Sequence, residues 1–128
     1  GLAIKGRMSV STLRGELRNV PLKDRSVAAV NTDSQIDVDM SDRLRHVRLV
    51  KGEVWFEVAK NPDVPFVVSA GDVRVRAVGT AFSVRRHEAG VDVLVTEGVV
   101  ETWNVNDKTR RQTLTAGNEA YVKRSPMP

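Results

Sequence analysis

Residues 75–84 read VRAVGTAFSV, in which a Gly-Thr pair at positions 79 and 80 interrupts an alternating apolar pattern. Glycine weakens a strand interior unless the backbone needs it there. The pair can mark a phosphate-binding loop, a catalytic threonine or a bend in a sheet. A phosphate loop needs several glycines that open onto a helix, whereas this lone glycine is followed by more strand-like sequence. We therefore expect Gly79 to allow a bend or a close backbone approach, and Thr80 to lie in a sheet.

Alternation of apolar and polar residues extends on both sides of this stretch, for example over 72–77 and 91–96. A period of two is the signal of a half-buried strand, and short strands separated by frequent turn residues indicate a sandwich, barrel or solenoid. We expect an all-β single domain of mostly antiparallel short strands, built as a twisted, solenoid-like or jelly-roll-like sandwich. The residues predicted to fill its core are Leu49, Val54, Phe56 or Trp55, Phe66, Val68, Val78, Phe82, Val84, Val93, Val95 and Val100.

A weak internal repeat supports stacked strand pairs. Residues 49–54, 95–100 and 114–119 each read apolar-x-x-Gly, and residues 12–17 form a looser copy. Each glycine can turn the chain with a positive φ between two strands. Repeated strand–turn–strand units are typical of stacked hairpins or a solenoid.

Composition narrows the function classes. The 128 residues carry a net charge of +4 and no cysteine, which excludes disulfides, zinc–thiolate sites and thiol nucleophiles. The basic residues are spread along the chain and aromatic residues are few, so a mixed solvated surface is favoured over a nucleic-acid or lipid surface. No apolar run approaches the ~18 residues that a membrane helix requires.

Candidate catalytic residues are sparse. The two histidines, His46 and His87, are far apart and belong to no metal-binding pair, so a cupin-like metal site is not expected. No Gly-x-Ser-x-Gly elbow is present for a serine nucleophile. Asp37 and Asp39 share one strand face and could bind calcium or act as acid and base, but an exposed polar face explains them as well, and we prefer that interpretation. We predict no enzyme activity, no catalytic residue, no bound metal and no cofactor.

One region is more specific than these general patterns. Four motifs follow each other in order: Leu-x-x-Gly-Glu-Val-x-Phe-x-Val at 49–58, Pro-Phe-x-Val at 65–68, Val-Gly-Thr-x-Phe-x-Val at 78–84 and Val-x-Val-x-x-Gly-x-Val at 93–100. Their order and spacing resemble the FecR family of extracytoplasmic regulators. Upstream, Asn31 and Ser34 resemble the Asn-x-x-Ser turn of that family. The resemblance covers about residues 12–122 of a 1–128 FecR-type periplasmic domain.

The resemblance implies that the motif residues shape the fold and carry no chemistry. These residues are Gly52, Glu53, Phe56, Pro65, Phe66, Gly79, Thr80, Phe82 and Gly98. Two positions depart from the family pattern. The early turn reads Asp24-Arg25-Ser26 where Asp-Gly-Ser is usual, so this turn must be built differently. Val64 replaces the arginine that usually precedes Pro-Phe, so a polar contact is expected to be missing.

The resemblance also implies a signalling role. FecR-like proteins relay a signal from the signalling domain of an outer-membrane TonB-dependent transporter, often one for siderophores, to an extracytoplasmic-function sigma factor. We expect this chain to be the periplasmic part of such an inner-membrane anti-sigma regulator. The cytoplasmic sigma-binding segment, the membrane helix and a C-terminal subdomain are expected to lie outside it. The alternative is a periplasmic carbohydrate- or cell-wall-binding β-domain, for which Trp55 or Trp103 would form the platform.

Overall fold

The computed structural model describes residues 6–125, apart from the side chain of Lys108. All the secondary-structure elements in that range are β-strands. No helix within residues 6–125 is long and apolar enough to cross a membrane. The all-β class is confirmed. The strands are β1 (Arg7–Ser11), β2 (Arg18–Pro21), β3 (Val27–Val30), β4 (Gln35–Ser41), β5 (Leu44–Glu57), β6 (Phe66–Ala70), β7 (Val73–Ala77), β8 (Ala81–Arg86), β9 (Gly90–Glu97), β10 (Val99–Asn104), β11 (Asp107–Thr115) and β12 (Glu119–Lys123).

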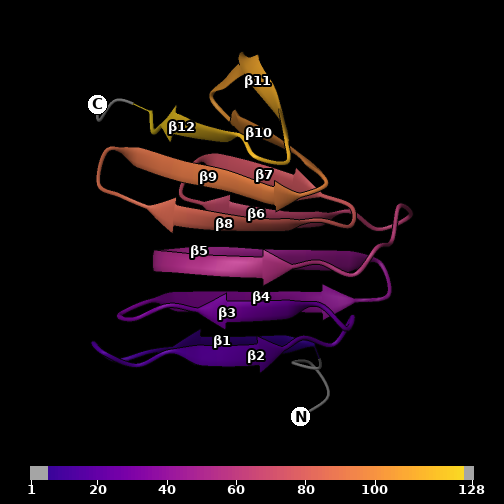
Figure 1. The fold of residues 1–128 in the computed structure, drawn as a ribbon, viewed down its shortest axis with the longest axis vertical. Coiled ribbons are helices and arrows are strands. Elements are labelled where there is room, and N and C mark those ends of the chain that lie inside the picture. Colours follow the sequence, from indigo (N-terminus) through magenta and orange to yellow (C-terminus); the bar gives the residue numbers. More distant parts are fainter. Residues whose placement is uncertain (1–5, 126–128) are drawn as a thin grey trace.

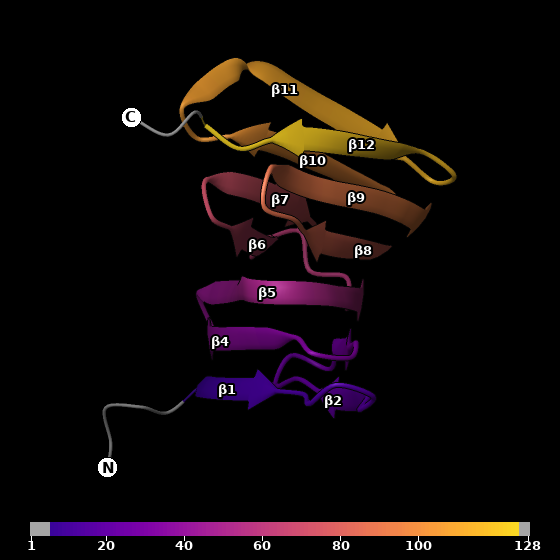
Figure 2. The same cartoon turned by 90° about the vertical axis from the view of Figure 1, so that its left-hand side faces the viewer.

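The strands form two sheets that share β5 and pack face to face (Figure 1 and Figure 2). Sheet A runs β1, β4, β5, β6, β7, β10 and β11 in neighbour order. Sheet B runs β2, β3, β5, β8, β9 and β12. All pairs are antiparallel except β5 with β6. The chain climbs the stack from its indigo to its yellow end as it alternates between the sheets, which agrees with the expected solenoid-like sandwich.

Strand β5 passes from one sheet to the other in its middle. Its residues 44–51 pair with β4 in sheet A, and its residues 52–57 pair with β8 in sheet B. Gly52 lies at the change of sheet with a φ of +88°. Glycine adopts this conformation easily, whereas a side chain on Cβ disfavours it. One glycine therefore lets a single strand serve both layers.

The apolar-x-x-Gly repeat marks further crossings between the sheets. Its four glycines all have a positive φ: Gly15 (+86°), Gly52 (+88°), Gly98 (+80°) and Gly117 (+89°). Three of them lie between two strands as expected, whereas Gly52 lies inside β5. Gly15 joins β1 to β2, Gly98 joins β9 to β10, and Gly117 joins β11 to β12. Each of these connections leads from a strand of one sheet to a strand of the other.

The core fills the space between the two sheets, and nearly all the predicted core residues are buried in it. Phe56 is fully buried and its neighbour Trp55 is 36% exposed, so the strand puts them on opposite faces as alternation requires. Val78 was predicted to be in the core but is only half-buried. It follows the end of β7, where the chain has already left sheet A.

The Gly-Thr pair of the opening stretch lies in a connection and not in a strand, so the expectation that Thr80 lies in a sheet was wrong. Strand β7 of sheet A ends at Ala77, and β8 of sheet B begins at Ala81. The alternation changes phase across this gap. Buried residues occupy odd positions before it (Val73, Val75, Ala77) and even positions after it (Phe82, Val84). The Gly-Thr pair thus marks the change of sheet.

Candidate functional site

The first cluster of motif residues fixes the crossing in β5. The Glu53 amide donates to Ser34 Oγ over 3.0 Å, and Asn31 Nδ2 donates to Glu53 Oε1 over 2.7 Å. A Cβ on Gly52 would lie 2.8 Å from Ser34 Cα and closer still to its hydroxyl. The Asn-x-x-Ser turn and the Gly-Glu pair, which are separate in the sequence, thus form one contact between sheets. Their groups serve each other and are not turned toward a ligand.

The second cluster surrounds the Gly-Thr pair. A Cβ on Gly79 would lie 2.9 Å from Lys60 Cα, and a Cβ on Gly98 would lie 2.8 Å from Thr80 Cγ2. Gly79 therefore allows the close backbone approach expected from the sequence. The Thr80 carbonyl accepts a hydrogen bond from the Val58 amide at 2.8 Å. Three connections of the chain meet here, at 58–60, 78–80 and 98.

Thr80 lacks the surroundings of a catalytic nucleophile. Its hydroxyl is buried, and within residues 6–125 it has no hydrogen-bond partner. A nucleophilic hydroxyl needs an adjacent general base to remove its proton. The methyl group of Thr80 lies against the Gly98 turn, where a Cβ on Gly98 would come within 2.8 Å of it.

The aromatic motif residues form the centre of the core. The ring centroids of Phe56 and Phe66 lie 5.4 Å apart in an edge-to-face arrangement, and Phe56 lies the same distance from Phe82. These three rings come from β5, β6 and β8, so they join both sheets. Pro65 is half-buried immediately before β6. We propose that all nine motif residues act through the fold alone.

Arg45 is a buried charge that the sequence analysis did not single out. It is 3% exposed, and its Nη1 donates to Asp24 Oδ2 at 3.0 Å. Its guanidinium also donates to the carbonyls of Val64 (2.6 Å), Ala59 (2.7 Å), Asn61 (3.2 Å) and Val78 (3.3 Å). A signal was available, because a strand that turns His46 outward must turn Arg45 inward. Arg45 therefore holds the 58–65 connection against β5, including the backbone at Val64.

The two histidines contact different neighbours and do not come together in a metal-binding cluster. His46, on the outer face of β5, contacts Ser69 Oγ through Nε2 at 2.9 Å. Partial burial and the neighbouring Arg74 lower its pKa below the ordinary value, so its neutral form is favoured. His87 lies in the connection before β9 and contacts Asp92. Residues 6–125 contain no group of three or more side chains suited to hold a metal ion.

The paired carboxylates of β4 are occupied by neighbours. Asp37 accepts from Ser9 Oγ at 2.8 Å and from Arg48 Nη2 at 2.6 Å. These two hydrogen bonds lower the pKa of Asp37. Asp39 lies 3.7 Å from Arg7 Nε. An ion-paired carboxylate of lowered pKa is a poor general base, so the exposed polar face is the better interpretation.

The two tryptophans differ in how much of each ring a ligand could reach. Trp55 lies on the outer face of sheet B beside two small residues, Ala29 on β3 and Ser83 on β8. Trp103 lies on the outer face of sheet A, where the guanidinium of Arg111 sits 4.2 Å from its ring centroid. The Arg111 side chain thus covers one face of that ring. Trp55 is the better candidate for a stacking platform.

Comparisons with known proteins agree with this fold. A family model described as FecR protein matches residues 8–101. Two crystal structures of a candidate anti-sigma factor from Parabacteroides distasonis ATCC 8503, at 2.50 and 1.65 Å resolution, superpose with TM-scores of 0.82 and 0.81 at 23% identity. The alignment covers 91% of this chain but 55% of each of those chains. At this identity the likeness establishes a shared fold. A search of curated proteins found no match.

Proposed function

The chain belongs to the FecR family, and from that premise we propose that it is the periplasmic sensing part of a transmembrane regulator. The regulator would relay a signal from an outer-membrane TonB-dependent transporter, such as a siderophore transporter, to an extracytoplasmic-function sigma factor. The chain would contact the signalling domain of the transporter. A cytoplasmic segment joined to it through a membrane helix would contact the sigma factor.

The observation that carries this proposal is the family match over 8–101, which includes every motif residue. The geometry supports a binding role, because the motif residues are used in the core and at the crossings between sheets. The histidines and the paired carboxylates are engaged by neighbouring side chains. The surfaces available to contact a partner are the exposed faces of the sheets, the connections and the sheet edges. Such surfaces suit recognition of another protein.

A transcription reporter in cells tests the relay. The full regulator would carry either the native domain, a deletion of this domain, or Phe82→Ala, which removes a ring from the core. Addition of the transporter's ligand should change sigma-dependent transcription with the native domain but not with the deletion or with Phe82→Ala. Phe82→Leu, which keeps an apolar side chain at the same place, serves as the matched control. An unchanged response after deletion of the domain would rule out the proposed relay.

A glycan-binding role is the second candidate, because Trp55 is exposed and flanked by small side chains. Such a shelf allows a sugar ring to stack on the indole. The Trp103→Phe variant leaves Trp55 as the only tryptophan, so its fluorescence reports on this face alone. Saturable quenching by peptidoglycan fragments would favour the glycan role. Unchanged fluorescence with these fragments would exclude Trp55 as their platform.

A further inference from the structure

The two sheets end unevenly at the C-terminal end of the stack. Near this end, β10 of sheet A and β12 of sheet B lie at the same height in the stack (Figure 2). Sheet A has one more strand beyond them, β11, which pairs with β10. Within residues 6–125, β12 pairs only with β9, so no strand of sheet B lies opposite β11. At the other end, β1 and β2 finish at the same level. Only beside β12 would an added strand be covered by a strand of the facing sheet.

The free edge of β12 presents unpaired main-chain groups. The Val95 amide donates to the Asn118 carbonyl at 3.0 Å, and the Arg124 amide donates to the Ala89 carbonyl at 3.0 Å. Antiparallel pairing alternates along a strand, so the even-numbered residues of β12 bond to β9. The main-chain groups of its odd-numbered residues, with Tyr121 at the centre, therefore point to the open side. The last of these carbonyls, that of Lys123, accepts from Asn104 Nδ2 at 3.0 Å.

The composition of β12 leaves this edge open to pairing. Natural edge strands are protected by proline, charge or short length. Strand β2 has four residues and ends in Pro21, and β11 carries Arg110 and Arg111. The centre of β12 is instead Ala-Tyr-Val, with the acidic Glu119 at its start and the basic Lys123 at its end, beside the groove. Tyr121 is 46% exposed.

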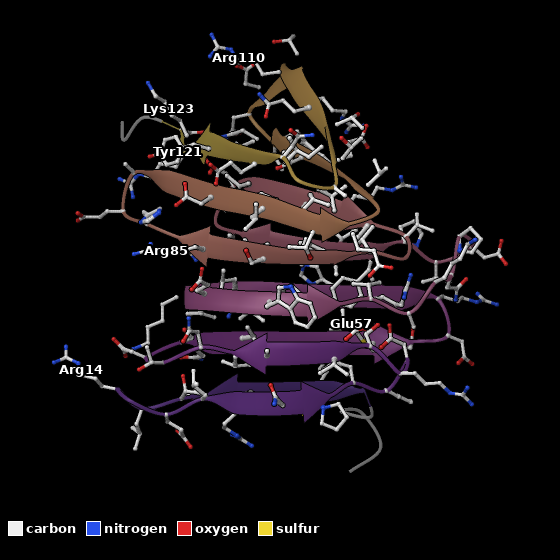
Figure 3. The ribbon with its side chains drawn as sticks, viewed as in Figure 1. Arg14, Glu57, Arg85, Arg110, Tyr121 and Lys123 are labelled. Atoms are coloured by element: carbon white, nitrogen blue, oxygen red, sulfur yellow. The ribbon has the colours of Figure 1, made fainter. Side chains whose placement is uncertain are left out.

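A groove of about 540 Å³ occupies the vacant position. One wall is the side of β11 that carries Arg110 and Gln112, in line with the buried Leu114. The other wall is β12 with Tyr121 and Lys123. Figure 3 shows Arg110, Tyr121 and Lys123 together at this end of the molecule. The groove thus has the C-terminal part of the β12 edge on one side and β11 with the β10–β11 turn on the other.

The groove carries a positive charge. Arg110, Lys123 and Arg124 line it, and Asp107 is its only acidic residue among those described. Asp107 pairs with Arg110 Nε at 3.3 Å, but the Arg110 side chain is 84% exposed and can turn toward an incoming ligand. Opposite charge attracts and like charge repels across an interface. The occupant that fits is an extended segment with acidic side chains.

We propose that an extended, acidic segment of a partner protein adds to sheet B beside β12. Its main chain pairs with the edge around Tyr121. Acidic side chains on its inner face meet Arg110 of β11, and acidic side chains on its outer face lie beside Lys123. This addition gives sheet B the strand that it lacks opposite β11. The inference goes beyond the proposed function, because it concerns the chemistry of the segment and holds whichever protein supplies it.

Two short synthetic peptides test the proposal: one alternates valine with glutamate, and the other alternates valine with lysine. Fluorescence anisotropy would measure their binding to the chain, and hydrogen exchange would follow the Tyr121 amide. We expect the acidic peptide to bind about tenfold or more tightly than the basic one, because repulsion is replaced by attraction. The Tyr121 amide should become protected only with the acidic peptide. Equal binding of both peptides would overturn the charge argument.

Substitutions in β12 and β11 locate the binding. Tyr121→Pro removes the amide that faces the open edge and breaks no bond to β9, so it should weaken acidic-peptide binding about tenfold. Tyr121→Phe keeps that amide and should bind like the native chain. Arg110→Glu with Lys123→Glu should reverse the preference between the peptides. Thermal melts of each variant show that the fold is kept.

Three results would overturn the proposal. Tyr121→Pro that binds the acidic peptide as the native chain does would place the site elsewhere. Self-association that Tyr121→Pro abolishes would assign the edge to a second copy of this chain. Peptide binding that disappears in a longer natural form of the protein would assign the groove to the polypeptide that follows. Because the peptides involve no transporter, these results are independent of the relay test.

Discussion

At the scale of single residues, Arg25 shows how this chain builds a turn without the usual glycine. Arg25 has a φ of +74°. Asp24 stabilises the turn, because its Oδ1 accepts from the Ser26 amide at 3.0 Å and its Oδ2 accepts from the Ser26 hydroxyl at 2.8 Å. The departure from Asp-Gly-Ser thus leaves an arginine in the left-handed region, where a side chain is strained.

Arg25→Gly should stabilise the chain by about 0.5–1 kcal/mol. Relief of the left-handed strain is worth about 1–2 kcal/mol, and the greater freedom of glycine in the unfolded state offsets part of it. Urea unfolding would measure the change. Arg43→Gly is the control, because Arg43 is exposed in a turn without a positive φ. Destabilisation by both substitutions would contradict the strain at Arg25.

Arg45→Met should destabilise the chain by about 3–5 kcal/mol, the usual effect of removing one partner of a buried ion pair. Asp24 and the backbone carbonyls around Arg45 would lose their donor. Arg45→Lys should recover only part of this loss, because one ammonium cannot reach the oxygens that the planar guanidinium reaches. Equal stability of the lysine variant and the native chain would show that charge alone matters there.

Phe82→Ala should destabilise the chain by about 3–5 kcal/mol and leave it nearly unfolded, since small domains have about 5–15 kcal/mol in total. The ring is fully buried against Phe56. Phe82→Leu should lose much less, because it leaves a smaller cavity. A cooperative melt of Phe82→Ala at the native temperature would contradict the packing of the three rings.

At the scale of elements, the crossings between sheets decide the architecture, and β5 makes the most demanding one. Gly52 combines a positive φ with close contact to Ser34. Gly15 has nearly the same φ, but a Cβ there would meet no atom within 4 Å. Substitution of Gly15 therefore tests the strain of the positive φ alone, whereas substitution of Gly52 adds steric overlap with Ser34.

Gly52→Ala should destabilise the chain by more than Gly15→Ala. Strain of a left-handed residue contributes about 1–2 kcal/mol to both, and only at Gly52 must Ser34 and its neighbours also move. Chemical denaturation of both variants gives the difference directly. Equal losses in the two variants would mean that β5 adapts freely at its crossing.

The sequence predicts the elements better than their connections. Alternation predicted that Phe56 and Trp55 lie on opposite faces, because a strand offers only two faces. It did not decide which of the two is buried, and the structure shows that Phe56 is. The repeat located positive-φ glycines, at a turn for Gly98 and at the change of sheet inside β5 for Gly52. The sequence analysis kept Thr80 in a sheet, although the buried positions change from odd before Gly79 to even after Thr80. The open edge of β12 was also out of reach, because it depends on how many strands each sheet receives.

At the scale of the whole molecule, polar contacts join the two sheets near the C-terminal end of the stack. The Ser125 amide donates to Asp72 Oδ2 at 2.9 Å, which attaches the segment after β12 to the start of β7. Burial acts to raise the pKa of Asp72, but the hydrogen bonds from Ser125, the Asp72 backbone and Asn104 together outweigh it and lower the pKa below its ordinary value of 3.8. The charged form of Asp72 therefore stabilises the folded state.

Acid should weaken this attachment of the segment after β12 to Asp72. A carboxylate with a lowered folded pKa contributes its full stabilisation above the ordinary pKa and loses it as the pH falls through the folded value. The native chain should therefore lose more stability below about pH 4 than Asp72→Asn, whose amide does not titrate. Urea midpoints at a series of acidic pH values would show it. Superimposable profiles of the two proteins would exclude a contribution from Asp72.

The most direct test of the sensing role is a calorimetric titration of this chain with the N-terminal signalling domain of a TonB-dependent transporter from the same organism. The proposed function predicts saturable binding, with Phe82→Leu behaving like the native chain. Absence of binding both to this chain and to the complete periplasmic region would contradict the sensing role and favour the glycan alternative.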